Sequence, residues 1–152
     1  MNISMITFRK ATIKDKEQVA YLVTLLHEDL SLDEALNEYD YFLERGVFFV
    51  VCVDDKIIAF VHGAIRTEYI EGSEQYKNPK VGYIESLFVL PQYRKQGIAK
   101  RLCTMLEKWA KNQGANEFAS DAYADNKESI AFHESIGLTA SPPIIHFIKK
   151  LK

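Results

Sequence analysis

The alternation of apolar and polar positions along the chain predicts a mixture of strands and helices. Runs rich in β-branched and aromatic residues favour strands, whereas apolar residues three or four positions apart favour amphipathic helices. The predicted strands cover residues 5–11, 47–53, 57–70, 81–90, 117–123 and 144–148. The predicted helices cover about residues 13–29, 32–45, 97–113 and 126–136. This order predicts an α/β fold with an antiparallel start, followed by a right-handed parallel crossover within residues 81–123.

Two capping boxes support the boundaries of the first two helices. Thr12 is followed three residues later by Asp15, and Ser31 is followed at the same spacing by Glu34. In such pairs the side chains satisfy backbone N–H groups that have no partner at the start of a helix. Residues 71–80 are polar and contain Gly and Pro, so we expect a mobile loop there.

Length and composition indicate one globular domain over residues 1–152. Hydrophobic residues make up 47% of the chain and charged residues 26%, so it can fold around its own core without disulfides or a metal. Cys52 and Cys103 lie in apolar segments without zinc-like spacing, and we expect two buried thiols and no metal. No apolar run approaches the roughly 18 residues of a membrane span, and we expect a cytoplasmic protein with no membrane partner.

The net charge of −2 is unevenly distributed. Residues 28–44 contain seven acids and no Lys or Arg, which leaves +5 for the rest of the chain. This segment is either an acidic wall for a cationic substrate or the solvated face of a helix. This acidity argues against nucleic acid as a partner, because nucleic-acid binding needs a basic patch.

The segment between the predicted strand 81–90 and the next helix has the features of a diphosphate-binding loop. It consists of Arg94, Lys95, Gln96, Gly97, Ile98 and Ala99. The first N–H groups of a helix are free and carry positive partial charge, and Gly97 lets the backbone approach a bulky anion. The segment is neither a Walker loop nor a GxGxxG motif, and taken alone it is equally consistent with an ordinary capped helix.

Two longer stretches give this loop a context. The stretch Glu85-Ser-Leu-Phe-Val-Leu-Pro-Gln-Tyr-Arg-Lys-Gln-Gly-Ile-Ala99 closely resembles the signature of GCN5-related N-acetyltransferases, and so does Asn126-x-x-Ser-Ile-x-Phe-His-x-x-x-Gly-Leu138. The resemblance implies a mixed, mostly antiparallel twisted sheet of six to seven strands with about four helices. In that fold a central parallel pair of strands splays apart where acetyl-CoA enters.

The resemblance also assigns the residues that bind acetyl-CoA. Backbone N–H groups of residues 95–99, with Arg94 beside them, would hold the pyrophosphate. Leu87, Phe88 and Val89 would pair with the pantetheine arm, and Asn126 would reach the arm or the thioester.

Within the superfamily the chain is most similar to type I aminoglycoside 6′-N-acetyltransferases. The particular matches are Glu68-Tyr69-Ile-Glu-Gly72 and Glu117-Phe-Ala-Ser-Asp-Ala122. In that subgroup, acids at the positions of Glu85 and Asp121 bind the ammonium groups of the drug, and Tyr69 lies in the matched loop. The alternative for both acids is a buried salt bridge or hydrogen-bond network.

An amine must lose a proton before it attacks a thioester directly, so a carboxylate is a reasonable general base. Asp121 and Glu85 are the candidates. His133 stands where the superfamily commonly has a tyrosine, and it is a candidate proton donor, although packing beside Phe132 is equally consistent. His146 is a further candidate donor.

The chain lacks the acidic residues that the subgroup often carries after its final helix. Residues 139–143 read Thr-Ala-Ser-Pro-Pro instead. We expect the acidic segment 28–44, with Glu34 and Glu38, to supply the missing charge. Other hypotheses are acetylation of a polyamine, a small metabolite or a protein amine, and an acyl-CoA-binding module without turnover. By analogy with the family we expect a homodimer.

Overall fold

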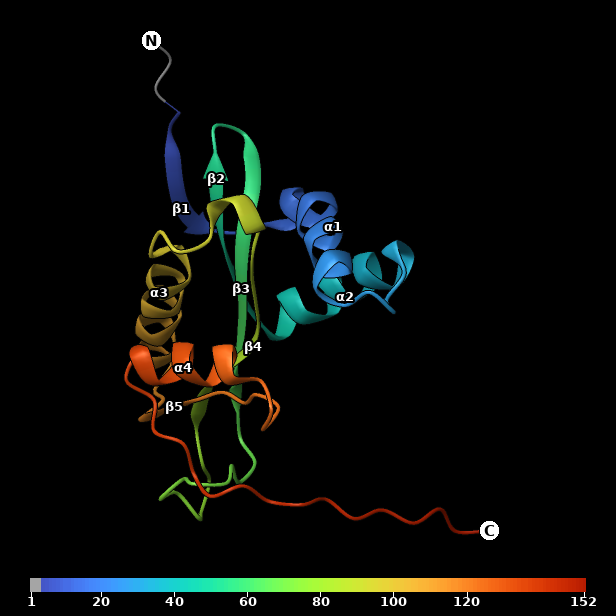
Figure 1. Cartoon of the computed structure of the whole chain (residues 1–152), viewed down its shortest axis with the longest axis vertical. Coiled ribbons are helices and arrows are strands. Elements are labelled where there is room, and N and C mark those ends of the chain that lie inside the picture. The colour runs from blue at the N-terminus through green and yellow to red at the C-terminus, as the bar shows by residue number, and fades with distance from the viewer. Residues whose placement is uncertain (1–3) are drawn as a thin grey trace.

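The computed structural model describes residues 4–152, and in this range it contains one sheet in the order β1-β2-β3-β4-β5 (Figure 1). The strands are β1 (Ile6–Lys10), β2 (Gly46–Val53), β3 (Lys56–Arg66), β4 (Val81–Val89) and β5 (Glu117–Ala119). Neighbouring strands from β1 to β4 are antiparallel, and β5 joins β4 in parallel. The predicted fold class, with its antiparallel start and parallel crossover, is confirmed.

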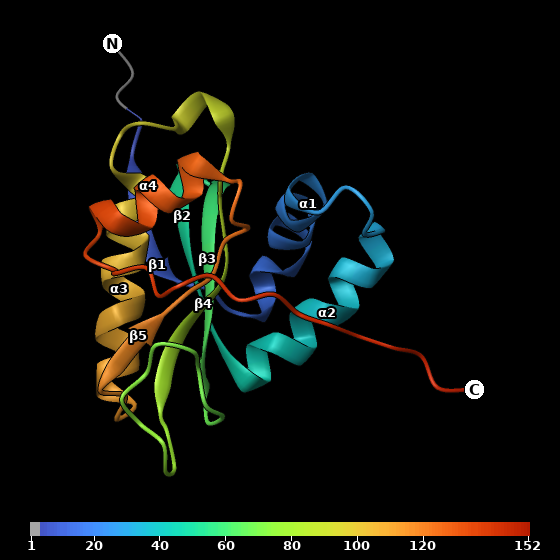
Figure 2. The same cartoon turned by 60° about the horizontal axis from the view of Figure 1, so that its bottom comes forward.

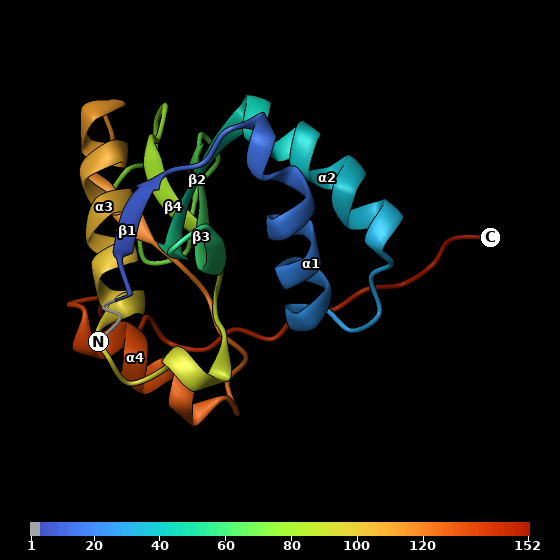
Figure 3. The same ribbon diagram turned by 90° about the horizontal axis from the view of Figure 1, so that it is seen from above.

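Helices cover both faces of this sheet. They are α1 (Lys16–Leu26), α2 (Leu32–Arg45), α3 (Ile98–Asn112) and α4 (Lys127–Ser135), with single 3₁₀ turns η1 (Ile13–Asp15) and η2 (Pro91–Tyr93). Figure 3 shows α3 on one face, α1 and α2 on the other, and α4 across one end of the sheet. Both predicted capping boxes are present, although the first one opens η1, which leads into α1.

Two glycines allow α3 to pack closely on the sheet. A Cβ atom at Gly63 would lie 2.3 Å from Leu106 Cδ1, and one at Gly82 would lie 2.4 Å from Ala110 Cβ. Both contacts are too short for a real side chain, so larger residues would push α3 away from β3 and β4. Because side chains alternate across a strand, His62 next to Gly63 faces the opposite side, toward α1 and α2.

Three strand predictions need correction. The predicted strands 57–70 and 117–123 end at Arg66 and Ala119, and the strand predicted over 144–148 is absent. The sheet therefore has five strands among the described residues, not six to seven. A strand needs a partner for its backbone hydrogen bonds, and residues 139–152 run away from the sheet as an extended segment (Figures 1 and 2).

The loop 71–80 is held to the sheet at one point. The carboxylate of Glu117, at the start of β5, accepts hydrogen bonds from Ser73 Oγ (2.5 Å), Gln75 Nε2 (2.5 Å) and the backbone N–H of Glu74 (3.2 Å). These donors lower the pKa of Glu117, because they stabilise its charged form. The contact fixes the near end of the loop against β5.

Candidate active site

A β-bulge in β4 places Glu85. Along the β3–β4 ladder His62 pairs with Ser86 and Gly63 pairs with Ile84, so Glu85 has no partner opposite it. Such an extra residue bends the strand and redirects its side chain. The Glu85 carboxylate accepts two hydrogen bonds from Arg66, one from Nε and one from Nη2, each at 2.8 Å. The ion pair is half-buried and raises the pKa of Arg66.

The second predicted acid, Asp121, follows the point where the parallel strands separate. The β4–β5 pairing comprises three residue pairs and ends at Tyr83 and Ala119. Asp121 lies two residues further on and accepts a hydrogen bond from the Tyr83 hydroxyl through one oxygen, Oδ2. The Arg66 guanidinium lies 3.5 Å from the centre of the Tyr83 ring. Arg66 and Tyr83 thus connect the two acids in one polar network.

The predicted diphosphate loop has the backbone of an anion site. Lys95 (φ 62°) and Gly97 (φ 78°) adopt left-handed conformations, and α3 starts immediately afterwards. The first hydrogen bond of the helix runs from Arg101 N–H to the Gly97 carbonyl, which leaves the preceding amides of the helix without helical partners. No side chain caps this helix. The free amides and the helix dipole favour an anion here.

The Arg94 side chain makes contacts with the end of β4 in addition to carrying positive charge. Its Nε donates to the Val89 carbonyl at 2.8 Å, and its guanidinium lies 5.5 Å from the Phe88 ring centre. The side chain therefore ties the loop to the end of β4.

Beyond its pairing with β5, β4 has an open edge. Leu90 N–H donates to the Ile58 carbonyl on β3. Since backbone groups alternate in direction along a strand, Phe88 also points toward β3, whereas Leu87 and Val89 point toward the open edge. Arg94 already occupies the Val89 carbonyl. The groups available to an added extended chain are thus those of Leu87 and the N–H of Val89.

The two ends of α4 carry the other two predicted site residues, Asn126 at its start and His133 in its last turn. Asn126 caps the helix, and its Oδ1 accepts from Ser129 N–H at 3.1 Å. His133 Nδ1 donates to the Ser129 carbonyl at 2.6 Å, and Nε2 lies 2.8 Å from Ser120 Oγ. With Nδ1 protonated, Nε2 accepts from the Ser120 hydroxyl, so both ring nitrogens have partners. His133 links α4 to the segment that follows β5.

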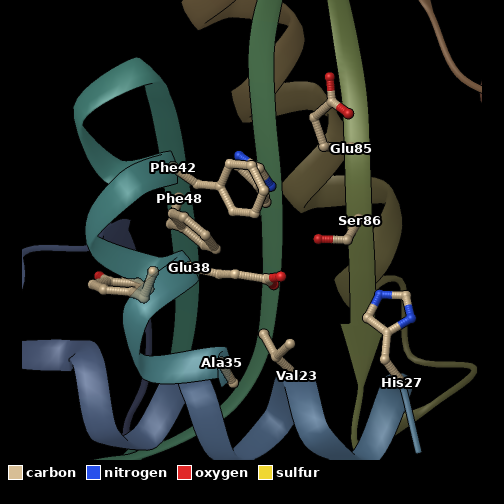
Figure 4. Close-up of a pocket in the computed structure, with 10 residues that line it drawn as sticks. Val23, His27, Ala35, Glu38, Phe42, Phe48, Glu85 and Ser86 are labelled. Atoms are coloured by element: carbon tan, nitrogen blue, oxygen red, sulfur yellow. The ribbon is translucent and has the colours of Figure 1, made fainter. Parts of the chain in front are cut away.

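A cavity of about 220 Å³ lies on the other side of Glu85, between the sheet and helices α1 and α2. It brings together two predicted substrate residues, Glu38 and Glu85. The other lining residues are Val23, His27, Ala35, Tyr39, Phe42, Phe48, His62 and Ser86. In Figure 4 Glu38 reaches from α2 toward the sheet, and the Ser86 hydroxyl points into the space.

The remaining predicted substrate residues lie elsewhere. Glu34 completes the capping box of α2, in which its Oε1 accepts from the N–H of the N-cap residue Ser31 at 3.2 Å. Tyr69 is exposed, with its ring stacked 5.6 Å from that of Tyr76. The cavity is not lined by Glu34, Tyr69 or Asp121.

Sequence reasoning gave no role to His62, which proves to be a wall of the cavity. Its ring stacks on Phe48 (centres 4.4 Å apart, planes at 8°) and lies 4.7 Å from that of Phe42. Burial lowers its pKa from 6.5 to about 4, so the ring is neutral near pH 7. A histidine between Val61 and Gly63 in an otherwise apolar strand was the available signal.

Neither cysteine is placed for covalent catalysis. Both thiols are unpaired and buried, and burial raises the pKa of Cys103 to about 12. Across residues 4–152 we found no group of three or more His, Cys, Asp or Glu side chains that could hold a metal ion. In the same residues, no helix combines the length and apolar character needed to cross a bilayer.

The mixed sheet, the open edge of β4 and the loop before α3 together define an acyl-CoA-dependent acetyltransferase fold. The chain belongs to the acetyltransferase (GNAT) family, whose model matches residues 11–138.

Individual relatives and structures share a narrower description. Aminoglycoside N(6′)-acetyltransferase type 1 of Acinetobacter haemolyticus is 40% identical over 98 residues, which cover 64% of this chain and 66% of that protein. Its namesake from Acinetobacter baumannii is 34% identical over 125 residues, covering 82% of this chain and 83% of its own. Aminoglycoside N-acetyltransferase AAC(6′)-Iy in complex with CoA has a TM-score of 0.90 at 26% identity, covering 99% of this chain and 98% of that one. AAC(6′)-Iy in complex with the bisubstrate analogue CoA-S-monomethyl-acetylneamine has a TM-score of 0.89 at 27% identity, covering 97% and 100%.

Proposed function

We propose that this protein transfers the acetyl group of acetyl-CoA to the 6′-amine of aminoglycosides, by direct attack in a ternary complex. The observation that carries the proposal is the position of the acids. Glu85 and Asp121 lie near the point where β4 and β5 separate, and from there β4 continues as an open strand edge toward the anion-binding loop before α3. Relatives with aminoglycoside 6′-N-acetyltransferase names, and a matching structure with a CoA-based bisubstrate analogue, support the same substrate.

Acetyl-CoA would lie along β4. The free amides that precede Arg101 in α3, with Gly97, hold the pyrophosphate, and Lys95 and Gln96 border it. The pantetheine arm pairs with Leu87 and Val89 at the open edge and brings the thioester toward Glu85. When bound, the coenzyme supplies the activated acetyl group, and the free amide of the Asn126 side chain is available to its arm.

The two acids divide the work on the amine. Glu85 has both oxygens on Arg66, so it attracts the ammonium group electrostatically while staying fixed. Asp121 is exposed and uses only Oδ2 within the chain, on Tyr83. Its free oxygen is the better group to take the proton, directly or through water. A proton-donating role of His133 requires the ring to leave Ser120, and water is the alternative donor.

The direct test is thiol release from acetyl-CoA by purified protein across an amine panel. Kanamycin and tobramycin should be turned over, whereas spermidine and lysine-containing peptides should be much poorer acceptors. Turnover confined to spermidine or peptide would replace the substrate with another amine. Tight binding of acetyl-CoA without turnover of any amine would reduce the protein to a binding module.

The C-terminal segment supports the expected homodimer. Ile145, Phe147 and Ile148 are 80%, 90% and 97% exposed, and β5 is an edge strand with its outer side open. A second copy that pairs with this segment would bury its apolar side chains and extend the sheet. The full chain should elute as a dimer in size-exclusion chromatography with light scattering, and the double variant Phe147→Glu/Ile148→Glu should be monomeric. A monomeric wild-type chain would refute the dimer.

A cytoplasmic location fits the same proposal. The two cysteines are unpaired, as in a reducing compartment, and acetyl-CoA is a metabolite of the cell interior.

A further inference from the structure

The cavity beneath Glu85 contains a polar pair that the chain leaves without internal partners. His62 on β3 and Ser86 on β4 are directly opposite in the ladder, and both line the cavity. His62 is only 5% exposed, yet no hydrogen bond joins its ring nitrogens to any other part of residues 4–152. Among the described residues only Asp40 Oδ1 is a fully buried side-chain atom without a partner, so the ring nitrogens of His62 keep access to the cavity that the residue lines. They are therefore available to hydrogen-bond a ligand there.

The walls of this cavity define the shape of that ligand. Phe42 and Phe48 flank the His62 ring, and Tyr39 and Val23 add apolar surface. At about 220 Å³ the cavity is smaller than the roughly 300–1,000 Å³ of sites that enclose drug-sized molecules. It therefore accepts one ring of an aminoglycoside rather than the whole molecule.

The charges around the cavity suit a cation that also carries hydroxyl groups. Glu38 and Glu85 supply negative charge, and His27 is exposed at the rim. His62 adds no positive charge to repel the substrate, because its stacked and buried ring stays neutral near pH 7. A neutral imidazole offers one donor and one acceptor, which matches a hydroxyl group.

We propose that His62, together with Ser86, recognises a hydroxyl group on the aminoglycoside ring that carries the reacting amine. The inference rests on the proposed function, since it requires an aminoglycoside acceptor. We choose the ring that carries the reacting amine because it must lie close to the thioester. Ser86 is adjacent to Glu85 and precedes Leu87, where the arm of the coenzyme would deliver the thioester. His62 is thus a specificity residue and not a general base.

Kanamycin B and tobramycin provide a matched test, because tobramycin lacks only the 3′-hydroxyl of the ring that bears the 6′-amine. The substitution His62→Phe keeps a ring stacked with Phe42 and Phe48 and removes both ring nitrogens. A hydrogen bond with a net value of about 0.5–1.5 kcal/mol corresponds to a change of roughly 2- to 13-fold. We expect His62→Phe to lower kcat/KM for kanamycin B several-fold more than for tobramycin, so that the ratio between the two drugs falls about 3- to 10-fold.

Two further variants separate recognition from packing. Ser86→Ala should also lower the ratio of kcat/KM for kanamycin B to that for tobramycin. His62→Gln retains a donor and an acceptor, so its ratio should lie between those of His62→Phe and the wild type. The acetyl-CoA Kd and the thermal midpoint of each variant report on folding. Equal losses for both drugs, or no loss for either, would overturn the role of His62. Wild-type protein that acetylates neither drug would instead refute the proposed function, so the two failures are distinguishable.

Discussion

Arg66 and Glu85 form a two-pronged ion pair at the point where β4 carries an extra residue. Both distances between guanidinium nitrogens and carboxylate oxygens are 2.8 Å. A guanidinium with both prongs on one carboxylate fixes its position as well as its charge. The pair thus holds Glu85 in place between the cavity under α1 and α2 and the region where the parallel strands separate.

Replacing Glu85 with Gln should damage acceptor use far more than coenzyme binding. The amide keeps the shape but loses the charge that attracts an ammonium group, and charge-assisted hydrogen bonds are worth about 1.5–3 kcal/mol. We expect kcat/KM for kanamycin to fall at least tenfold, with the acetyl-CoA Kd changed by less than about twofold. Steady-state kinetics and calorimetry measure the two effects. A variant as active as the wild type would remove Glu85 from the site.

Gly97→Ala should weaken acetyl-CoA binding. The added methyl group meets no atom of the protein within 4 Å, so it projects into open space at the N-cap of α3, where we expect the pyrophosphate to bind. A left-handed Ala also costs about 1–2 kcal/mol of backbone strain. Gly137→Ala is the matched control, because Gly137 also has a positive φ (96°) and open surroundings, at the end of α4. We expect a Kd increase of about tenfold for the first variant only, by calorimetry, and equal Kd values would argue against the loop.

Glu38→Gln should raise the KM for polycationic drugs about two- to fivefold, since Glu38 lines the cavity while remaining open to solvent. Added salt should reduce the difference from the wild type, because screening weakens the attraction. Glu44→Gln, at an exposed position on the same helix, provides the control. If both variants behaved alike, the acidic segment 28–44 would be a solvated helix face.

The stability of the protein should fall as the pH drops from about 6.5 toward 4, partly because of His62. In the unfolded chain this histidine takes up a proton near pH 6.5, but in the folded chain burial holds its pKa at about 4. Between these values protonation favours the unfolded state. The free energy of unfolding, measured with urea, should fall between pH 7.5 and pH 5. The fall for the wild type should exceed that for His62→Phe by about 2 kcal/mol. Identical losses would show that the ring titrates normally.

Local sequence signals predicted much of the fold. The capping residues Thr12 and Ser31, the turn-forming Gly97 and the apolar spacing of α3 each act over a few neighbouring residues, so they can be read without a structure. The strand at 144–148 was wrong because strand formation depends on a partner. Residues such as Phe147 have strand propensity, but the described chain offers them no neighbour.

The candidate site was harder to predict from the sequence, because the register between β3 and β4 determines which side chains meet there. The bulge at Glu85 follows from the way β3 and β4 align, and no local motif specifies it. The same alignment places Arg66 on Glu85 and His62 opposite Ser86. For His133, the sequence offered a proton donor or a packing residue. The structure shows the ring packed edge-on against Phe132, with centres 5.8 Å apart, and in addition hydrogen bonds at both ring nitrogens.

The ladder between β4 and β5 stops after three residue pairs, and beyond them the backbone on that edge of β4 makes no pairing with β5. A ligand that arrives there can dock and depart as a local event, with the core between the helices undisturbed. Substitutions that face the gap can therefore change how long the coenzyme stays bound without changing how firmly the protein is folded. Residues that face this gap therefore act first on coenzyme affinity, whereas residues of the core act first on folding.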